Sequence, residues 1–429
     1  MAQKRILFVS SVGNVAWGGA EELWSRAAIN LAAEEFTVSA SVVGWSPPHP
    51  RTLNLTERGI EVWFRPTAYP LRKRAWRALV SPEKTATTLE FERMIAARSP
   101  DFVVISDGAP FPPLDLLEMC VAKRLPFVII VQCNQYFWWP ADALAERYRA
   151  ALAAGLRCYF VSDANLRIAE KQIGCELSNA EVVRNPFNVN YKASPPWPPL
   201  GRNGELRFAC VGRLDPPGKG QDILFEVLAG REWATRDWRL HLYGDGENRG
   251  GLERLAQRLQ LADRVVFEGH VADVEKVWSL NHVLVMPSRI EGLPLAVIEA
   301  MLCGRPVVAT DVAGGEVIED GVTGFLAEAP TVGCFGNALE RFWAQKEDAS
   351  EIGATAAKRI RRLVPPDPAR VFADKIMELL GAGSATRSQF APSGPRRRSR
   401  SVEGGERTPT ARKLTLFVEA ATRPRISGP

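Results

Sequence analysis

The sequence predicts an α/β protein made of two doubly wound domains, each with a parallel sheet. Short apolar, β-branched runs alternate with segments of helical periodicity, which is typical of parallel βαβ units. The chain has 429 residues, the length of two domains of ~150 to 200 residues each. A stretch rich in Pro and Gly interrupts the alternation, which then starts again. These observations together predict two sheets rather than one.

The first domain is expected to span residues 1–186. Its expected strands are residues 5–10, 37–43, 60–64, 102–106, 126–131 and 158–162. The first strand is followed by the loop SVGNVAWGG and then by a helical segment. One apolar stripe at helical spacing is formed there by Ala20, Leu23, Trp24, Ala27, Ala28 and Leu31.

The break in the alternation is placed at residues 187–204, where NVNYKASPPWPPLGRNG suits neither a helix nor a central strand. This segment is expected to be the linker. The second domain is expected over residues 205–365, with strands at 205–211, 238–243, 264–268, 283–286 and 306–310. A helix over residues 366–381 is expected to pack back on the first domain.

The net charge of +5 is concentrated in the last residues of the chain. Residues 382–429 carry ten Lys/Arg and three Asp/Glu, and are rich in Ser, Pro, Gly and Arg. This composition predicts a disordered basic tail. The rest of the chain is close to neutral, and nucleic-acid binding needs clustered positive charge on an ordered face, so no nucleic-acid partner is expected.

The seven cysteines are scattered and never form C-x-x-C, so neither a disulfide framework nor a zinc site is expected. The chain runs from Met1 directly into an apolar strand, without the pattern of a secretory leader. No apolar run reaches the ~18 residues of a membrane span. A cytoplasmic protein is therefore expected.

The segment from His282 to Ala327 is the most informative. It reads as a strand, a short loop, a helix that begins near Pro294 and ends at Gly304, and another strand. The backbone N–H groups of Gly292 and Leu293 would point out of the helix start, where the helix dipole favours an anion such as a diphosphate. Open α/β sheets bind ligands at this edge, beyond the carboxyl ends of the strands.

Two glutamates, Glu291 and Glu299, lie eight residues apart around the start of this helix. Glu299 would face the cleft if Leu295, Ile298 and Leu302 pack on the sheet. A carboxylate there can accept hydrogen bonds from ribose hydroxyls, and one in the loop can accept them from a sugar. The alternative is that both are ordinary surface glutamates, and spacing alone favours neither interpretation.

Positive charge for the same sheet edge comes from the segment FACVGRLDPPGKGQDIL. Arg213 follows a strand and Lys219 lies in the turn before the next helix, so both can reach phosphate oxygens. They could neutralise the charge that grows on a leaving nucleoside diphosphate. Taken alone, the two residues favour the alternative interpretation, which is two solvated loop cations.

Together, GRLDPPGKGQD and PSRIEGLPLAVIEAMLCGRPVVATDVAGG resemble the C-terminal domain of family 4 glycosyltransferases. YGDGENR, VVFEGHVADV and EDGVTGFLA match the same family in the same order. The resemblance extends over about residues 5–380 in layout and is most specific from Phe208 to Leu326. It implies the GT-B fold, with two facing Rossmann-like domains, and a retaining transfer from a nucleoside diphosphate sugar.

The resemblance also implies roles for individual residues. Arg213 and Lys219 would bind the donor diphosphate, Glu299 the ribose and Glu291 the donor sugar, while amides of Gly292 and Leu293 would help to hold phosphate or sugar. Glu291, Arg213 and Lys219 are the expected catalytic residues. Base recognition is expected from backbone near Gly269–Val271.

The first domain resembles the family less completely. VGNVAWGGAEE resembles a loop that closes over the donor, which assigns Gly18 and Gly19 to donor binding. Many members have a histidine after the fourth or fifth strand of this domain. The segment VIIVQCNQYFWWP offers Asn134 and Gln135 there, and the only histidine of the domain is His49.

Several further features are assigned to the acceptor side. Asp107, with Gly108, follows the FVVIS strand and joins Asn134 and Gln135 at the expected sheet edge. Residues 136–139 (YFWW) could stack on sugar rings or be partly core. The basic, apolar segment Leu71–Val80 could lie on an anionic membrane or be a solvated helix.

The sequence therefore predicts a hexosyltransferase-like enzyme, with a glycan, a lipid-linked molecule or a small molecule as acceptor. No metal and no other cofactor are expected, because the basic pair replaces a divalent cation. The alternatives are a catalytically impaired relative that binds sugar nucleotides, and a nucleotide-sugar epimerase or phosphorylase on the same fold. Peripheral contact with the inner face of the membrane is a further possible feature.

Overall fold

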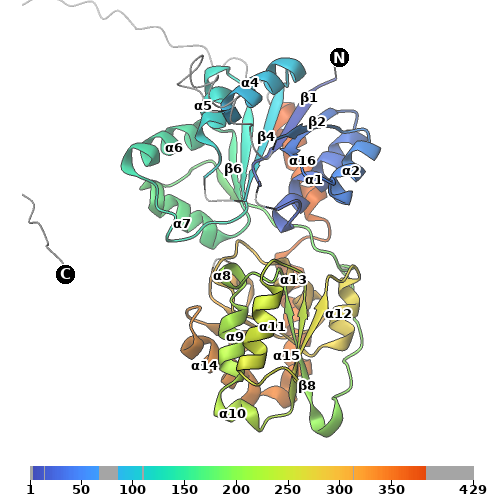
Figure 1. The fold of residues 1–429 in the computed structure, drawn as a ribbon. Coiled ribbons are helices and arrows are strands. Elements are labelled where there is room, and N and C mark those ends of the chain that lie inside the picture. The colour runs from blue at the N-terminus through green and yellow to red at the C-terminus, as the bar shows by residue number, and fades with distance from the viewer. Residues whose placement is uncertain (1–2, 14, 67–85, 109–110, 313, 383–429) are drawn as a thin grey trace, which may run out of the picture. The chain divides into compact units, whose positions relative to one another are not determined.

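The computed structural model describes residues 3–13, 15–66, 86–108, 111–312 and 314–382 (Figure 1). Residues up to Ala382 form one compact unit. The basic segment Leu71–Val80 and the expected disordered tail lie outside the described residues. Within the described ranges, every helix is too short or too polar to cross a bilayer.

The first sheet is parallel throughout, with the strand order β3-β2-β1-β4-β5-β6-β7. Its strands are β1 (Arg5–Ser10), β2 (Thr37–Val43), β3 (Glu61–Arg65), β4 (Phe102–Asp107), β5 (Phe127–Val131), β6 (Arg157–Phe160) and β7 (Ala180–Val182). Its helices are α1 (Gly19–Ala33), α2 (Pro50–Glu57), α4 (Ala86–Arg98), α5 (Leu114–Ala122), α6 (Asp142–Ala154) and α7 (Asp163–Ile173). The six expected strands are confirmed, and β7 was missed because its three half-buried residues carry no apolar pattern.

The second sheet is also parallel, in the order β10-β9-β8-β11-β12-β13. Its strands are β8 (Leu206–Val211), β9 (Trp238–Tyr243), β10 (Val265–Gly269), β11 (Val283–Met286), β12 (Val307–Thr310) and β13 (Gly324–Ala327). Its helices are α8 (Pro216–Lys219), α9 (Gln221–Leu228), α10 (Arg231–Ala234), α11 (Arg249–Arg258), α12 (Val274–Leu280), α13 (Leu295–Leu302), α14 (Val332–Ala344) and α15 (Ala349–Leu363). Short 3-10 turns lie at Arg202–Gly204, Gly315–Val317 and Lys346–Asp348.

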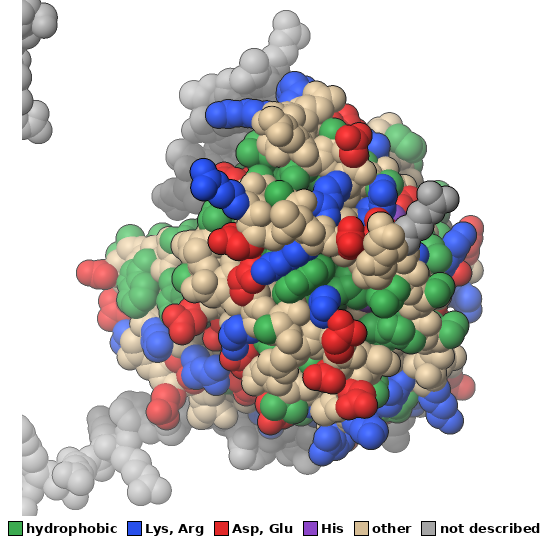
Figure 2. All heavy atoms as spheres, turned by 90° about the horizontal axis from the view of Figure 1, so that it is seen from below, with side chains coloured by type: hydrophobic (Ala, Val, Ile, Leu, Met, Phe, Trp, Pro, Cys, Tyr) green, Lys and Arg blue, Asp and Glu red, His purple; other side chains and the backbone are tan. Residues whose placement is uncertain are grey.

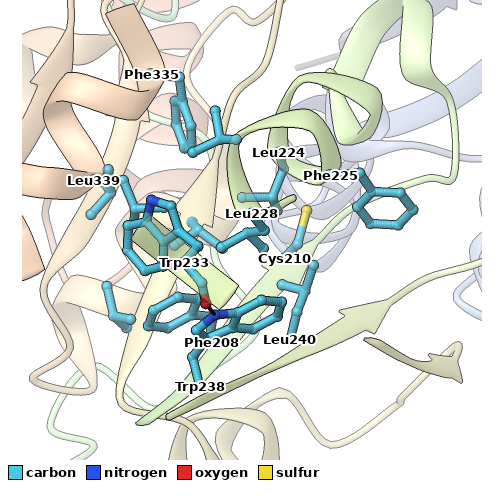
Figure 3. Close-up of a cluster of buried hydrophobic side chains, with 14 of the residues drawn as sticks. Phe208, Cys210, Leu224, Phe225, Leu228, Trp233, Trp238, Leu240, Phe335 and Leu339 are labelled. Carbon is cyan, nitrogen blue, oxygen red and sulfur yellow. Dashed lines mark hydrogen bonds between the residues drawn. The ribbon is translucent and has the colours of Figure 1, made fainter. Parts of the chain in front are cut away.

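Aromatic side chains fill the core on one side of the second sheet (Figure 3). The rings of Phe208 and Trp238 are stacked, with centroids 6.3 Å apart, and Trp233 packs against Phe208 edge-on. The indole N–H of Trp238 donates to the carbonyl of Trp233 at 2.9 Å, so its polar group is satisfied within the core. This packing supports the strands whose carboxyl ends carry the candidate site.

The last described helix, α16 (Pro368–Ala382), belongs to the core of the first sheet. Phe372 and Ile376 are fully buried there, and the ring of Phe372 lies edge-on to Tyr159, with centroids 5.1 Å apart. The apolar side chains of α16 thus complete a layer that the first domain begins with α1.

The linker is fixed to the second sheet by one buried arginine, Arg305. Its guanidinium donates to carbonyls of the linker residues Pro195 and Pro196, at 3.3 and 2.7 Å, and to those of Trp278 and Asn281. Burial lowers the pKa of Arg305 to about 10. Because carbonyl groups satisfy the charge, this arginine holds the linker in place without a carboxylate partner.

Candidate functional site

Two loops at the carboxyl edge of the second sheet are clipped together. Arg289 forms a bidentate ion pair with Asp222, with both distances 2.7 Å, and the backbone amides of Arg289 and Ile290 donate to the carbonyl of Gly218. Burial alone would raise the pKa of Asp222, but hydrogen bonds from Arg289 and its charge lower it. The clip fixes the loop before α9 against the loop before α13.

This clip brings Lys219 and Glu291 together. Lys219 Nζ lies 2.5 Å from Glu291 Oε1, and the side chains are 22% and 8% exposed. The turn between the loops needs glycine, because Gly220 has φ +66° and a Cβ there would lie 2.1 Å from the carbonyl oxygen of Pro287. The sequence proposed both charged residues for the site, and the structure places them in direct contact.

Arg213 lies beside this pair. Gly212, its neighbour in the chain, is close to the Lys219 stem, since a Cβ on Gly212 would be 3.5 Å from Lys219 Cδ. The Arg213 side chain is 51% exposed, and its contact with Asp215 is long, at 3.5 Å. A half-exposed guanidinium next to a lysine can hold an anion without first breaking a strong ion pair.

The start of α13 offers free backbone donors next to these cations. The helix begins at Leu295 with Pro294 at its cap, and Gly304 has φ +72° just past its end, as the sequence predicts. Among the described residues, the amides of Gly292 and Leu293 donate no hydrogen bond. A Cβ on Gly292 would lie 1.8 Å from the carbonyl oxygen of Gln132, so the close approach requires glycine.

Glu299 is more enclosed than the sequence analysis expected. Its side chain is buried, and Oε1 accepts hydrogen bonds from the backbone amide and the side-chain amide of the linker residue Asn188, at 2.9 and 3.1 Å. Burial raises the pKa of Glu299. The linker partner was missed, because the two residues are 111 positions apart in the chain.

The expected packing of α13 is wrong at its first residue. Ile298 and Leu302 lie in the core, but Leu295 is only half-buried. A Cβ on Gly19 would be 3.3 Å from Leu295 Cδ1, so Leu295 faces the glycine loop instead of the sheet. This contact places the loop that contains Gly18 and Gly19 beside the start of α13.

A chain of hydrogen bonds links the glycine loop to Glu299. Trp17 Nε1 donates to Glu22 at 2.8 Å, and the same carboxylate accepts from Arg26 Nε at 2.8 Å. Arg26 Nη2 in turn donates to Asn188 Oδ1, at 2.7 Å. The helix that follows Gly18 and Gly19 is thereby connected to the residue that holds the Glu299 carboxylate.

A second carboxylate in the glycine loop region, Glu21, has an unusual environment. It is buried, and accepts hydrogen bonds from Ser10 Oγ, at 2.7 Å, and from the Trp24 indole. Burial raises the pKa of Glu21 to about 7, against the effect of these two hydrogen bonds. Glu21 lies within the motif VGNVAWGGAEE, and its burial was not predicted from the sequence.

The three acceptor-side candidates are buried. Asn134 Nδ2 donates to Gln172 Oε1 at 2.8 Å, and the Asn134 backbone amide donates to Asn165 Oδ1. Gln135 Nε2 donates to the backbone carbonyl of Glu291 at 3.2 Å, which places Gln135 beside Glu291. Asp107 is the last residue of β4 and its side chain is also buried. Asn134 therefore supports the loop structurally instead of facing the cleft.

The four aromatic residues after Gln135 are not core residues. Tyr136, Phe137 and Trp139 are exposed, and Trp138 is half-buried. The alternative that they are partly core is wrong for three of the four. The run of aromatic letters in the sequence was therefore no guide to burial.

Two further features concern the segment expected to recognise the nucleotide base, and His49, the histidine of the first domain. The backbone amide of His270, within the Gly269–Val271 segment, donates to Asp245 Oδ2 at 3.2 Å. His49 caps α2, accepting from the Arg51 amide, and stacks on Trp17, with centroids 5.4 Å apart. His49 therefore has a structural role, because it caps α2 and packs against Trp17.

Charge is distributed evenly over the surface shown in Figure 2, where Lys/Arg and Asp/Glu side chains are interspersed. In the described ranges, His, Cys, Asp and Glu form no group of three that could hold a metal ion. The same ranges contain all seven cysteines, which are free thiols. The candidate site residues described above are cations, carboxylates and backbone amides.

Two doubly wound parallel sheets, with cations and carboxylates at the carboxyl edge of the second, define the class of GT-B glycosyltransferases. Residues 205–345 match the family described as glycosyl transferases group 1. An uncharacterized glycosyltransferase of Haemophilus influenzae is 38% identical over 326 residues, which cover 75% of this chain and 85% of the relative. The chain belongs to this glycosyltransferase family.

Other comparisons agree in fold and class. A lipopolysaccharide 1,6-galactosyltransferase of Escherichia coli is 26% identical over 229 residues, which cover 48% of this chain and 58% of that relative. Among solved structures, Anabaena HepE in complex with UDP-glucose has a TM-score of 0.65 at 20% identity, and the match covers 88% of this chain and 99% of HepE. At that identity the likeness shows the shared fold.

Proposed function

We propose that this enzyme transfers a hexose or similar sugar from a nucleoside diphosphate sugar to a glycan, a lipid-linked molecule or a small molecule, with retention of anomeric configuration. The observation that carries the proposal is the Lys219–Glu291 pair, at 2.5 Å, beside the half-exposed Arg213. Positive charge and a sugar-binding carboxylate meet there, at the edge where open α/β sheets bind ligands.

Breaking the bond to the anomeric carbon leaves negative charge on the nucleoside diphosphate. Arg213 and Lys219 supply two positive charges for it, and the amides of Gly292 and Leu293 supply neutral donors. Glu291 accepts hydrogen bonds from the donor sugar, and Glu299 accepts them from the ribose. We propose that the acceptor enters on the face that the leaving diphosphate vacates, so the diphosphate can receive the acceptor proton and the configuration is retained.

The donor base remains to be identified, and a UDP-sugar is the first choice to test. HepE, which shares the fold, has been crystallised with UDP-glucose. No metal is included in the proposal, because the cationic side chains supply the charge that a divalent ion would.

Calorimetry with UDP-glucose, and with GDP and ADP sugars, tests the donor site. Arg213→Ala and Glu299→Ala should each weaken binding by roughly 10- to 100-fold, the effect of losing a hydrogen bond to a charged group. Arg362→Ala, which removes an exposed arginine of α15, is the matched control and should bind as the native protein does. Native affinity in both site variants would refute the donor assignment.

Turnover is measured separately, from nucleoside diphosphate release and the anomeric configuration of the product by NMR. An α-linked donor sugar should give an α-linked product, and EDTA should leave the rate unchanged. Inversion would refute the proposed mechanism while leaving the donor site intact.

A catalytically impaired donor-binding protein is the second candidate. Asn134 and Gln135 stand where many family members have a histidine, and both are buried in hydrogen bonds. This candidate would be favoured if the protein binds the donor but neither transfers the sugar to any of a broad panel of acceptors nor hydrolyses the donor.

A further inference from the structure

The aromatic loop, Tyr136–Trp139, carries the three most exposed large hydrophobic side chains of the described residues. Tyr136 and Phe137 are each 64% exposed, and Trp139 is 60% exposed. Single exposed apolar side chains are common on protein surfaces, but three large rings within four residues form a patch that calls for an explanation.

The exposure of these rings is built into the loop. Gln172 Nε2 donates to the carbonyls of Gln135 and Trp138, at 2.8 and 3.2 Å, and Gln172 Oε1 accepts from Asn134. Gln172 and Asn134 are buried, and the Trp138 amide also donates to the Gln135 carbonyl at 3.1 Å. A buried amide network therefore fixes the backbone that presents the rings, so little order must be gained when a ligand binds.

The aromatic loop begins next to the proposed donor site. Gln135, the residue before Tyr136, donates from Nε2 to the carbonyl of Glu291, which we assign to the donor sugar. A molecule that reaches the donor sugar from the first domain can thus lie across the rings. This step rests on the proposed function.

We propose that the aromatic loop is the acceptor platform, and that the acceptor is a glycan whose pyranose rings stack on Tyr136, Phe137 and Trp139. A pyranose has an apolar face of C–H groups and a rim of hydroxyls. Aromatic rings complement that apolar face, and the tyrosine hydroxyl and the indole N–H add polar contacts. Several rings in a row suit a ligand of several sugar units.

The charge near the loop favours a glycan over a lipid surface. The helix that follows the loop, α6, and the helix that contacts it through Gln172, α7, each carry two acidic and two basic residues. They are Asp142, Glu146, Arg147 and Arg149 in α6, and Asp163, Arg167, Glu170 and Lys171 in α7. Attraction to an anionic membrane needs an excess of basic residues, which these helices do not have.

Saturation-transfer NMR tests the platform with three defined probes: linear pentasaccharides of glucose, of N-acetylglucosamine and of mannose. The test variant combines Phe137→Ala with Trp139→Ala. Phe64→Ala, which removes an exposed aromatic side chain from β3, is the matched control. At least one probe should show equal saturation transfer from the native protein and from the control. The double variant should bind that probe at least about tenfold more weakly.

Binding of UDP-glucose, GDP-glucose and ADP-glucose is measured in all three proteins, and each donor should bind the three proteins equally. If none of the three donors binds the native protein, the proposed function is refuted, whereas a failure of the platform alone leaves donor binding intact. The platform is overturned if no pentasaccharide binds the native protein, or if the double variant binds as the native protein does. It is also overturned if vesicles of phosphatidylglycerol and phosphatidylethanolamine bind the native protein and not the double variant, which would assign the rings to a lipid surface.

Discussion

The carboxyl edges of the two sheets have different chemistry. The edge of the second sheet presents charge, in Arg213, Lys219 and Glu291. The edge of the first sheet buries neutral amides, Asn134 and Gln135, and exposes aromatic rings beside them. Under the proposed function, the two substrates would be recognised by different means: a charged donor by cations, and an acceptor by shape and stacking.

The same contrast applies to the carboxylates of the two domains. Glu291 contacts the cation Lys219, whereas Glu21 is buried with hydrogen-bond donors and burial raises its pKa to about 7. The first domain thus buries a carboxyl group among neutral hydrogen-bond donors, while the second places one against a lysine. Each of the following experiments changes one side of this comparison.

The largest effect is expected from Lys219→Met on the charged edge. The variant removes a charge proposed to stabilise the leaving diphosphate and leaves Glu291 buried without its partner. We expect kcat/KM for the donor to fall about 10³-fold, corresponding to ~4 kcal/mol of transition-state stabilisation. Lys358→Met, on the exposed side of α15, is the control and should keep native activity. A native rate in the Lys219→Met variant would show that the charge of Lys219 does not stabilise the leaving diphosphate.

The buried carboxylate of the first domain should make stability depend on pH. Folding raises the pKa of Glu21 from 4.5 to about 7, so the folded state binds more protons than the unfolded state between these values. The free energy of unfolding should therefore fall as the pH rises, by about 2 kcal/mol between pH 5 and pH 7. Above pH 7 this dependence should level off.

Urea unfolding of the native protein and of Glu21→Gln, at several pH values from 5 to 8, measures this dependence. The Gln side chain can still accept hydrogen bonds from Ser10 and Trp24 but does not titrate, so the Glu21 contribution to the slope should vanish. An equal slope in both proteins would show that Glu21 is ionised in the folded state, and the contrast with Glu291 would disappear.

The smallest effect is expected where the two edges meet. Gly292→Ala places a Cβ against the carbonyl of Gln132, so the loop must shift away from the first domain. We expect kcat/KM to fall about tenfold through misplacement of the reacting groups, with little loss of stability. Gly333→Ala, where an added Cβ meets nothing within 4 Å, is the matched control and should keep native activity. Native activity in Gly292→Ala would show that this approach is not needed for catalysis.

Much of the fold was predictable, because parallel strands buried on both faces are continuous apolar runs. The strand boundaries agree to within about two residues. Strand β7 was missed because its three half-buried residues show no apolar pattern, and β13 was missed as well. The helix α13 was placed correctly because Pro294 and Gly304 mark its ends.

The candidate site was predictable where it is local in the chain. Arg213 and Lys219 lie in one segment, and their charge together with the motif around them predicted an anion site. The hydrogen bonds of Glu299 with Asn188 and the Arg289–Asp222 clip join distant segments, so they could not be predicted from local sequence patterns. The exposure of Tyr136, Phe137 and Trp139 was also hidden, since composition does not report which way a loop side chain points.

The linker has a consequence for exchanging domains between relatives. Arg305 donates hydrogen bonds to the carbonyls of Pro195 and Pro196. Tyr191 and Ala193 are hydrogen-bonded to Arg361 of α15, and Asn188 is hydrogen-bonded to Glu299. The linker is therefore anchored to the second domain, although its sequence is typical of a spacer between domains. A chimaera that takes its first domain from another family member should be joined before Phe187, because a junction within the Pro-rich segment would leave the carbonyl groups around Arg305 to a foreign backbone.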